Sequence, residues 1–339
     1  MERSDTGPPK RPTVEDVAAR AGVSRATVSM VMRGARGPSA ATQQRVLKLA
    51  AEMGYRPDAR ARLLASGSSP LLGVVFSNFG VFHLQLLDGL YTAADKAGYD
   101  VILSALTANR DQRRAAETLM DFRCDAVILL GPDDGQPPVL AGRLPVVTVG
   151  WAAPGGAVDV VRTADDEGMR LMMGHLTELG HRNIVHIDGG SGAVSESRSH
   201  AYRAEMVKHG IGDHARVLQG GINQQHGVAA TRILLGEVEL PTAVLCYNDE
   251  LAAGVTESLL QAGHKVPQEV SITGWDDSPV AHEEALNITT VRQDVETMAR
   301  LAVERSVARL TAGTSPAEIV LAPQLILRGS TGRPRTAGC

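Results

Sequence analysis

From Leu71 onward, short β-branched segments alternate with longer segments of helical spacing, and this alternation restricts the fold more than any other feature of the chain. The expected strands are apolar along their length, as strands buried on both faces are: 71–77, 100–106, 125–131, 145–150, 183–189, 215–220, 242–248 and 270–275. The expected helices lie near 82–97, 110–122, 165–179, 197–208, 224–236 and 249–262. This alternation predicts the α/β class, with two doubly wound parallel sheets.

Two late strands, 288–291 and 324–328, flank an expected helix at 294–311. We expect them to cross between the two halves and to leave a cleft at the hinge. In such sheets, ligands bind beyond the carboxyl ends of the strands, in the crevice between the halves. Polar residues stand at these ends or in the following loops: Ser77, Asn78, Arg198, Asn248, Asp249, Asp276 and Asp277.

These polar residues have a binding and a structural explanation. Carboxylates, an arginine and amides that converge on a cleft can bind the vicinal hydroxyls of a sugar or nucleoside through charge-assisted hydrogen bonds. The same residue types cap helices, so Asn248, Asp249 and Asp277 are equally well explained as caps. The sequence leaves both explanations open.

The length of 339 residues predicts two or three domains. Charge is distributed unevenly along the chain. Residues 1–67 carry twelve Lys or Arg against six Asp or Glu, a net +6, whereas the remainder carries twenty-two against thirty-two, a net −10. A basic head on an acidic body indicates that only the head approaches a polyanion. A solvated basic surface without a partner would give the same charge balance.

Several classes of protein are disfavoured by what the sequence does not contain. It has no apolar run long enough to span a membrane and no signal-peptide core near its start, so we expect it to stay in the cytoplasm. Cys124, Cys246 and Cys339 lie far apart without a C-x-x-C pair. We therefore expect no disulfide framework, zinc site or other cofactor.

The basic head has the pattern of three short helices. Thr13 with Asp16 forms a capping-box-like start, and Gly22 ends the first helix where a left-handed residue is required. Ser24 caps the second helix, and Ser39 caps a third that closes at Gly54. The inward-facing residues are expected to be Val14, Val17, Ala18, Ala21, Val28, Val31, Met32, Val46, Leu47, Ala50 and Met53. Two helices joined by a tight glycine turn, with a third behind them, indicate a helix-turn-helix.

A helix-turn-helix directs the start of its second helix into the DNA major groove. Arg25, Ala26 and Met30 lie on the outward face of that helix, where an arginine can bind guanine and Ala or Met can contact a thymine methyl. Small donors near helix starts suit phosphate oxygens: Thr13, Ser24, Thr27, Ser29, Ser39 and Thr42. Any one of them alone is better explained as an ordinary cap or surface group, and it is their arrangement around a single turn that favours DNA binding.

The segment after the head, YRPDARARLLASGSS, begins at Tyr55. Its Pro57 and Asp58 can open a helix over 59–65, which is too short to be stable alone in water and must fold against a partner surface. A leucine wedged between base pairs in the minor groove would explain it, with Arg60 and Arg62 near phosphate. The alternative is a helix packed on the body.

Several motifs in one order carry a resemblance over residues 13–329. They are TVEDVAARAGVSRATVS, YRPDARARLLA, HLTELGHRNI, RSHAY, PTAVLCYND, VPQEVSITGWDD and ITTVRQ. The chain resembles the lactose-repressor (LacI/GalR) family of bacterial transcription regulators. The resemblance implies an N-terminal helix-turn-helix and a periplasmic-binding-protein-like (type I) core of two doubly wound parallel-sheet subdomains. It also implies a homodimer that binds a near-palindromic operator and responds to a small effector in the cleft.

The resemblance assigns roles by position. Arg25, Ala26 and Met30 resemble the base readers, Leu64 resembles the minor-groove leucine beside Ala61, and Arg33 and Tyr55 complete the expected DNA contacts. The effector site would comprise Arg198, Asn248 and Asp276 as polar clamps, with Ser77 and Gln293 nearby and Phe82 and Ile222 as apolar contacts.

The implied domains are a helix-turn-helix over 1–56, a hinge helix and linker over 57–69, an effector and dimerisation domain over 70–330, and a tail over 331–339. Within the large domain we expect an N-subdomain of about 70–162 and 292–322 and a C-subdomain of about 163–291 and 323–330.

Five features depart from the family pattern. Asp58 replaces a small polar residue or asparagine and would act as a helix cap worth about 1 kcal/mol, and Arg33 stands where asparagine is common. Gly150 and Thr163 occupy positions expected to face the cleft that are often aspartate, which would admit a bulkier or less hydroxylated ligand. No leucine-heptad tail follows, so we expect no tetramer built on one.

The leading hypothesis is therefore an operator-binding repressor whose affinity is modulated by a sugar or related metabolite. The alternative is a solute-binding receptor of a transport system, which would share the core but has no use for a basic helix-turn-helix. An enzyme is disfavoured because His186 and Asp188 have no nucleophile elbow or phosphate loop beside them. The sequence identifies neither the effector nor the operator, nor whether the effector releases DNA or promotes its binding.

Overall fold

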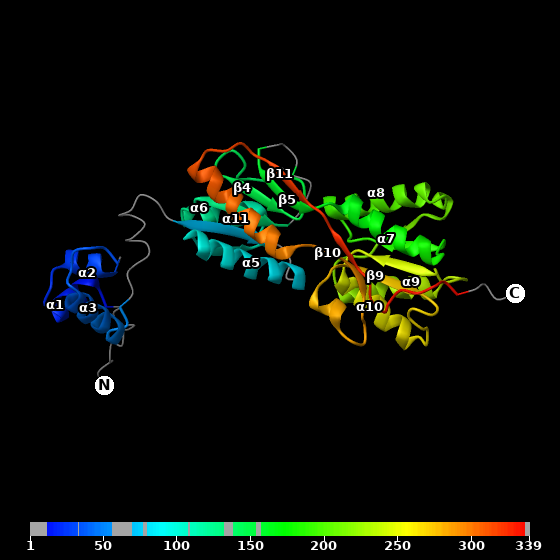
Figure 1. Cartoon of the computed structure of the whole chain (residues 1–339), viewed down its shortest axis with the longest axis horizontal. Helices are drawn as coiled ribbons and strands as arrows, with labels where there is room; N and C mark the ends of the chain where they lie inside the picture. Colours follow the sequence, from blue (N-terminus) through cyan, green and yellow to red (C-terminus); the bar gives the residue numbers. More distant parts are fainter. Residues whose placement is uncertain are drawn as a thin grey trace, which may run out of the picture. The chain divides into compact units, whose positions relative to one another are not determined.

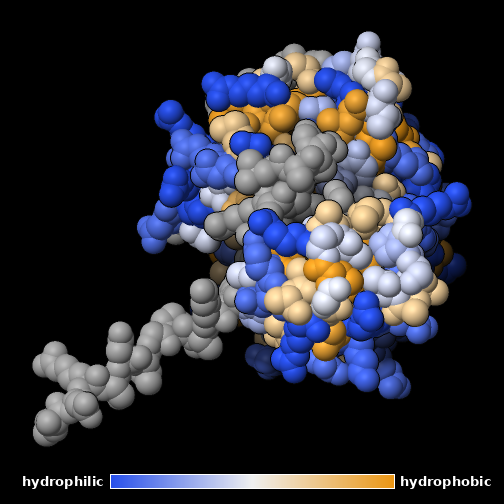
Figure 2. All heavy atoms as spheres, turned by 90° about the vertical axis from the view of Figure 1, so that its left-hand side faces the viewer, coloured by the Kyte–Doolittle hydropathy of each residue, from blue (hydrophilic) through white to orange (hydrophobic). Residues whose placement is uncertain are grey.

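The computed structural model describes residues 12–32, 34–55, 70–76, 80–107, 109–131, 138–153 and 157–335. The chain divides into two compact units, Met1–Ser69 and Pro70–Cys339, which we call the head and the body. Within the described part of the chain, no helix combines the length and the apolar character that crossing a bilayer would require. Figure 2 shows hydrophilic side chains over most of the face that it draws, with hydrophobic side chains in separate patches between them.

The described part of the head is built from the three helices that the sequence predicts: α1 (Val14–Ala21), α2 (Arg25–Met32) and α3 (Ala40–Glu52). The capping box at α1 is present, because Thr13 Oγ1 accepts from Asp16 N and Asp16 Oδ2 accepts from Thr13 N at 2.8 Å. Gly22 ends α1 in the left-handed region with φ 64°, which a residue with a Cβ adopts only at a cost. The helix-turn-helix is thus specified by its own local chemistry.

The core of the head follows the helical spacing with one exception. Val17, Val28 and Val46 are fully buried at its centre. The prediction that Leu47 faces inward is wrong, because its side chain is exposed, and Leu49 packs on the core instead. Leu49 is three residues after Val46 and lies near it around the helix, whereas Leu47 is displaced by a full helical step of about 100°.

The first half of the body, the N-lobe, comprises residues 70–163 and 295–321. Its sheet has the order β11-β5-β4-β3-β1-β2, all parallel. The strands are β1 (Leu71–Phe76), β2 (Asp100–Ala105), β3 (Ala126–Leu130), β4 (Val146–Val149), β5 (Asp159–Thr163) and β11 (Glu318–Leu321). Helices α5 (Val81–Ala97) and α11 (Val295–Thr311) pack side by side on one face and α6 (Gln112–Asp121) on the other (Figure 1).

The second half, the C-lobe, comprises residues 165–292 and 324–335. Its sheet repeats the same order, β12-β10-β9-β8-β6-β7, and only β12 is antiparallel. The strands are β6 (Ile184–Ile187), β7 (Arg216–Leu218), β8 (Ala243–Cys246), β9 (Ser271–Asp276), β10 (Thr289–Arg292) and β12 (Gln324–Ile326). Helices α7 (Asp165–Leu179) and α8 (Ala193–Lys208) cover one face, and α9 (Gln224–Leu235) and α10 (Asp249–Gln261) cover the other. Two short 3₁₀ helices, Gly212–His214 and Pro279–His282, complete it.

The chain passes between the lobes three times, after β5, after β10 and between β11 and β12, where Figure 1 shows the last passage in red. The expected late strands do not themselves cross, since β10 and β12 both belong to the C-lobe sheet. Strands β5 and β11 were not expected from the sequence. Both strands are short and contain charged residues. Asp159 of β5 is buried and pairs with Arg305 and Arg309, and β11 is a half-exposed edge strand. Helix α8 begins at Ala193 rather than near 197.

Candidate functional site

The start of α2 is exposed, as the sequence predicts. Arg25 and Ala26 both face solvent, and the Arg25 side chain stays 69% exposed while its Nη1 lies 2.9 Å from Oε1 of Glu15 in α1. DNA binding through Arg25 would have to replace this ion pair, because both partners compete for the same guanidinium donors. Met30 is only partly exposed and lies beside Gly37, so less of its side chain is available for a contact with a base than the sequence suggests.

Hydroxyl groups gather at the first turns of α2 and α3. Ser24 Oγ accepts from Thr27 N at 3.1 Å and lies 2.9 Å from Thr27 Oγ1. Ser39 and Thr42 repeat this arrangement, with distances of 3.3 and 2.9 Å. These side chains therefore act as helix caps, beside backbone N–H groups that suit phosphate oxygens. Their phosphate contacts remain a prediction.

The other expected DNA-contacting residues are less exposed or are not described. Thr13 bonds Asp16 in its capping box, Ser29 is partly buried, and Tyr55 packs on the core of the head. Four expected site residues lie outside the described residues: Arg33, Ala61, Leu64 and, in the effector set, Ser77. The described part of the head thus offers Arg25 and Ala26 as its exposed base-reading candidates.

A cavity of about 450 Å³ lies between the two lobes. The described residues that were expected to bind an effector all line it: Phe82, Arg198, Ile222, Asn248, Asp276 and Gln293. They come from α5, α8, the end of β9 and the loops after β7, β8 and β10, which lie far apart in the sequence. The parallel sheets bring them together because the carboxyl ends of their strands face the same crevice.

Arg198 is the most heavily constrained of these side chains. It is 4% exposed, its Nε donates to Asp165 Oδ1 at 2.9 Å, and its Nη1 donates to the Tyr247 carbonyl at 2.7 Å. The guanidinium also stacks on the Tyr247 and Trp275 rings, 4.7 and 4.2 Å from their centroids. Burial opposes the charge, but Asp165 nevertheless holds the pKa of Arg198 above its ordinary value. These contacts fix the guanidinium plane at the cavity wall.

Asp276 presents a carboxyl group to the same cavity. Burial raises its pKa to about 7, although Arg198 and a hydrogen bond from Gln293 Nε2 to Oδ1, at 2.7 Å, act in the opposite direction. Asp276 ends β9 with φ 109°, a left-handed conformation that is rare for a residue other than glycine. The backbone is thus held in a strained conformation where the carboxyl group enters the cavity.

Asn248 and Asp249 show the structural role that the sequence left open. Asn248 Oδ1 accepts from Leu251 N and caps α10, and its Nδ2 donates to the Ile222 carbonyl, both at 2.9 Å. Asp249 is fully buried and accepts from Ser278 N and Thr290 Oγ1. Asp249 is therefore a structural carboxyl group. Asn248 caps its helix and also lines the cavity, where it retains a second amide hydrogen.

The described N-lobe wall of the cavity is apolar and aromatic. Besides Phe82 it includes His83, whose pKa burial lowers to about 4, and Trp151, which is 3% exposed. Gly150 lines the cavity, as expected for a position at which the family often has an aspartate. The expectation for Thr163 is wrong: it is buried away from the cavity, where its Oγ1 lies 3.8 Å from Met298 Sδ.

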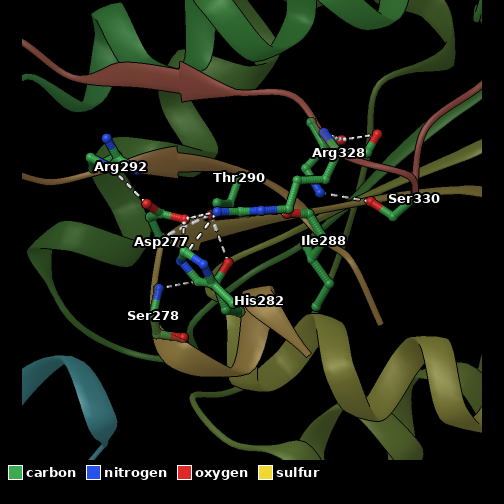
Figure 3. A network of polar contacts seen from close by, with 10 residues as sticks. Asp277, Ser278, His282, Ile288, Thr290, Arg292, Arg328 and Ser330 are labelled. Carbon is green, nitrogen blue, oxygen red and sulfur yellow. Dashed lines mark hydrogen bonds and ion pairs between the residues drawn. The ribbon is translucent and has the colours of Figure 1, made fainter. Parts of the chain in front are cut away.

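A second cluster lies where the chain leaves the C-lobe for the N-lobe (Figure 3). Asp277 Oδ2 accepts from Arg292 Nε at 2.6 Å, and its Oδ1 accepts from Arg328 and lies 3.0 Å from His282 Nε2. Burial opposes ionisation of Asp277, but the two arginines hold the pKa of its carboxyl group below the ordinary value. Arg292 ends β10, after which the chain passes to the N-lobe, and Arg328 follows β12, so this carboxylate joins two neighbouring strands of the C-lobe sheet.

His186 and Asp188, the two residues that could have been taken for catalytic groups, have structural roles. His186 is fully buried in β6, its Nδ1 lies 2.9 Å from the Leu245 carbonyl oxygen, and burial lowers its pKa to about 4. Asp188 Oδ1 accepts from the backbone N–H groups of Gly190 and Gly220, each at 3.0 Å. Neither residue is among those that line the cavity between the lobes.

Sequence reasoning missed several residues of the cavity: His83, Trp151, Tyr247 and Glu250, with Asp165 behind Arg198. Tyr247 and Glu250 flank Asn248 and Asp249, so their place at a strand end was a usable signal. Trp151 follows β4 in the same way. In the sequence, Asp165 is recognisable only as an acidic residue at the start of a helix. That pattern does not identify an arginine partner.

Two family models match the chain. The model described as bacterial regulatory proteins of the lacI family matches residues 13–58, and that of the periplasmic binding protein-like domain matches residues 173–331. The HTH-type transcriptional regulator CelR of Thermobifida fusca is 32% identical over 335 residues, which cover 95% of this chain and 98% of that protein.

Two solved structures extend the comparison to three dimensions. A lac repressor dimer bound to operator and the anti-inducer ONPF aligns with a TM-score of 0.83 at 26% identity, covering 95% of this chain and 100% of that one. A CelR–cellobiose complex aligns with a TM-score of 0.70 at 29% identity, covering 94% and 100%. With the helix-turn-helix, the two-lobed body and the cavity between the lobes, these likenesses show that the chain belongs to the lacI family of bacterial regulatory proteins and is a DNA-binding transcriptional regulator modulated by a small molecule.

Proposed function

We propose that this regulator is a repressor that binds a near-palindromic operator as a homodimer and responds to a sugar or related metabolite in the cavity. The observation that carries the proposal is the Arg198–Asp276–Asn248 wall, which combines a fixed guanidinium, a carboxyl group and an amide. This set matches the alternating donors and acceptors of vicinal hydroxyls. The cellobiose that CelR binds in its solved complex supports a carbohydrate effector.

The proposal gives the head and the body separate roles. Arg25 and Ala26 would read base edges, the hydroxyl pairs at α2 and α3 would hold phosphates, and residues 57–69 would form the hinge and linker. Residues 70–330 would bind the effector and form the dimer; the lac repressor in its operator complex is a dimer with a bound anti-inducer. Because its target is chromosomal DNA, we place the protein in the cytoplasm, and we assign it no catalytic role.

The test couples both sites in one titration. Genomic fragments that the full chain retains at low salt define the operator, and fluorescence anisotropy then measures its affinity with each of a panel of sugars, nucleosides and polyols. We expect one class of sugar to change operator affinity and to stabilise the fold, by about 2.7 kcal/mol at a hundred times its dissociation constant. Retention of no fragment would contradict the operator role. Stabilisation by a nucleoside instead of a sugar would contradict the proposed effector class.

A further inference from the structure

Glu250 joins the two lobes directly. It is the second residue of α10 in the C-lobe, and its Oε1 accepts a hydrogen bond at 2.9 Å from the backbone N–H of Val81, the first residue of α5 in the N-lobe. Glu250 and the adjacent Gly80 both line the cavity. This contact therefore lies at the rim of the crevice and connects residues 169 positions apart.

Helix α5 has no side-chain cap of its own. Its N-cap residue is Gly80, which has no side chain to offer, so the first N–H groups of a 17-residue helix need another acceptor. The Glu250 carboxylate supplies that acceptor and places a negative charge at the positive end of the helix dipole. Gly80 also makes room for it, because a Cβ there would lie 3.2 Å from Glu250 Oε1, closer than most Cβ contacts.

The lobes also meet through Val194. Val194, in the first turn of α8 in the C-lobe, packs against the N-lobe core cluster that contains Trp151. Both residues line the cavity, and Trp151 is 3% exposed. The cavity is thus bordered by a polar contact, Glu250 to Val81, and by an apolar contact at Val194, and separating the lobes would break both.

We propose that Glu250 is an interlobe latch: by capping α5 from the opposite lobe, it holds the cavity in the arrangement seen here. Loss of the cap lets the lobes separate, and separation uncovers Trp151. The proposal concerns the body alone and needs neither effector nor operator. Its test can therefore fail while the proposed function stands, and the reverse also holds.

The experiment compares full-length Glu250→Ala with Glu257→Ala. Glu257 is an acidic residue of the same helix that accepts from Gln224 within the C-lobe, so it controls for the loss of a carboxylate. Hydrogen exchange by mass spectrometry in a peptide containing Val81–Leu84 measures the cap. Acrylamide quenching measures Trp151, because the only other tryptophan, Trp275, is fully buried. We expect Glu250→Ala to raise exchange about tenfold and to increase quenching, and Glu257→Ala to change neither.

A second variant removes the donor instead of the acceptor. Val81→Pro deletes the N–H, and proline is well tolerated at the first position of a helix. Gly80, with φ −57° and ψ 152°, already has the extended conformation that a residue before proline requires. We expect Val81→Pro to increase quenching as Glu250→Ala does, and the double variant to add nothing further. Val81→Ala, which keeps the N–H, is the control.

Two results would overturn the latch. Faster exchange in α5 with unchanged quenching of Trp151 would show that Glu250 only caps the helix. Additive quenching effects of Glu250→Ala and Val81→Pro would show that they do not act through one bond. Urea unfolding of each variant establishes that it folds, and Val81→Pro, which removes the donor of the same bond, tests the latch if Glu250→Ala does not fold.

Discussion

Asp276 and Asp277 are consecutive residues with different surroundings: Asp276 lines the cavity between the lobes, and Asp277 binds Arg292 at the end of β10 and Arg328 after β12. Both have positive φ, 109° and 54°, so the turn that separates their roles is held under backbone strain. A ligand that binds Asp276 would act one peptide unit away from the carboxylate that joins β10 and β12. This gives the cavity a short covalent connection to a group that holds Arg292, the residue at which β10 ends before the chain passes to the N-lobe.

The first prediction concerns that connection. Asp277→Asn weakens the bonds to both arginines, and we expect the body to lose about 2 kcal/mol of unfolding free energy and the effector to alter operator affinity less. Effector affinity itself should change little, because Asp277 does not line the cavity. Urea unfolding and anisotropy measure the two effects, with the exposed Asp213→Asn as control. An unchanged effector response would contradict the connection.

The second prediction concerns the ion pair on the head. Glu15→Gln removes the ion pair that Glu15 makes with Arg25 and a negative charge near the expected DNA-binding surface. Operator affinity should therefore rise several-fold. Arg25→Ala should lower it by about 1–3 kcal/mol on the operator and much less on random DNA. Glu52→Gln, an exposed acid of the same head, controls for charge alone. Equal losses of Arg25→Ala on operator and random DNA would exclude base reading.

A third prediction follows from the buried pair of Arg198 and Asp165. We expect Arg198→Ala to abolish the effector response and to lower stability by about 3–5 kcal/mol, because a buried carboxylate loses its partner. Operator binding by the head should persist in the folded fraction. Arg203→Ala, an exposed position of the same helix, should leave the response intact. Normal effector affinity of Arg198→Ala by calorimetry would reject the clamp.

The raised pKa of Asp276, about 7, predicts a pH dependence. Between the ordinary carboxyl pKa and pH 7 the folded protein holds a proton that the unfolded chain has released, so this group makes stability fall as pH rises across that range. The ionised carboxylate is the stronger acceptor for hydroxyl groups. Effector affinity should therefore rise about tenfold from pH 6 to pH 8.

Asp276→Asn isolates this group from the others that titrate nearby. In the variant, both the decline of stability up to pH 7 and the rise of effector affinity above pH 6 should flatten. Calorimetric titrations and urea unfolding at pH 5, 6, 7 and 8 compare it with the unaltered protein. Identical pH profiles of the two proteins would show that Asp276 does not titrate in this range.

Much of the fold follows from local pattern. The caps at Thr13, Ser24 and Ser39 and the glycine at 22 specify the helix-turn-helix, since each acts within a few residues. The fully buried strands β1 and β3 of the N-lobe sheet were recognisable because their residues are apolar throughout. The two missed strands, β5 and β11, carry charged residues whose burial or pairing depends on distant partners, such as Arg305 for Asp159.

For this protein, then, the sequence by itself determined the three described helices of the head, most of the strands and the strand ends near which several of the expected effector residues stand. Only the tertiary structure decided that Asn248 caps its helix, that Thr163 lies away from the cavity, and that Glu250 binds the opposite lobe. The physical reason is range: caps and periodicity act over a few residues. Burial, ion pairing and contact across a crevice depend on groups that only the folded chain brings together.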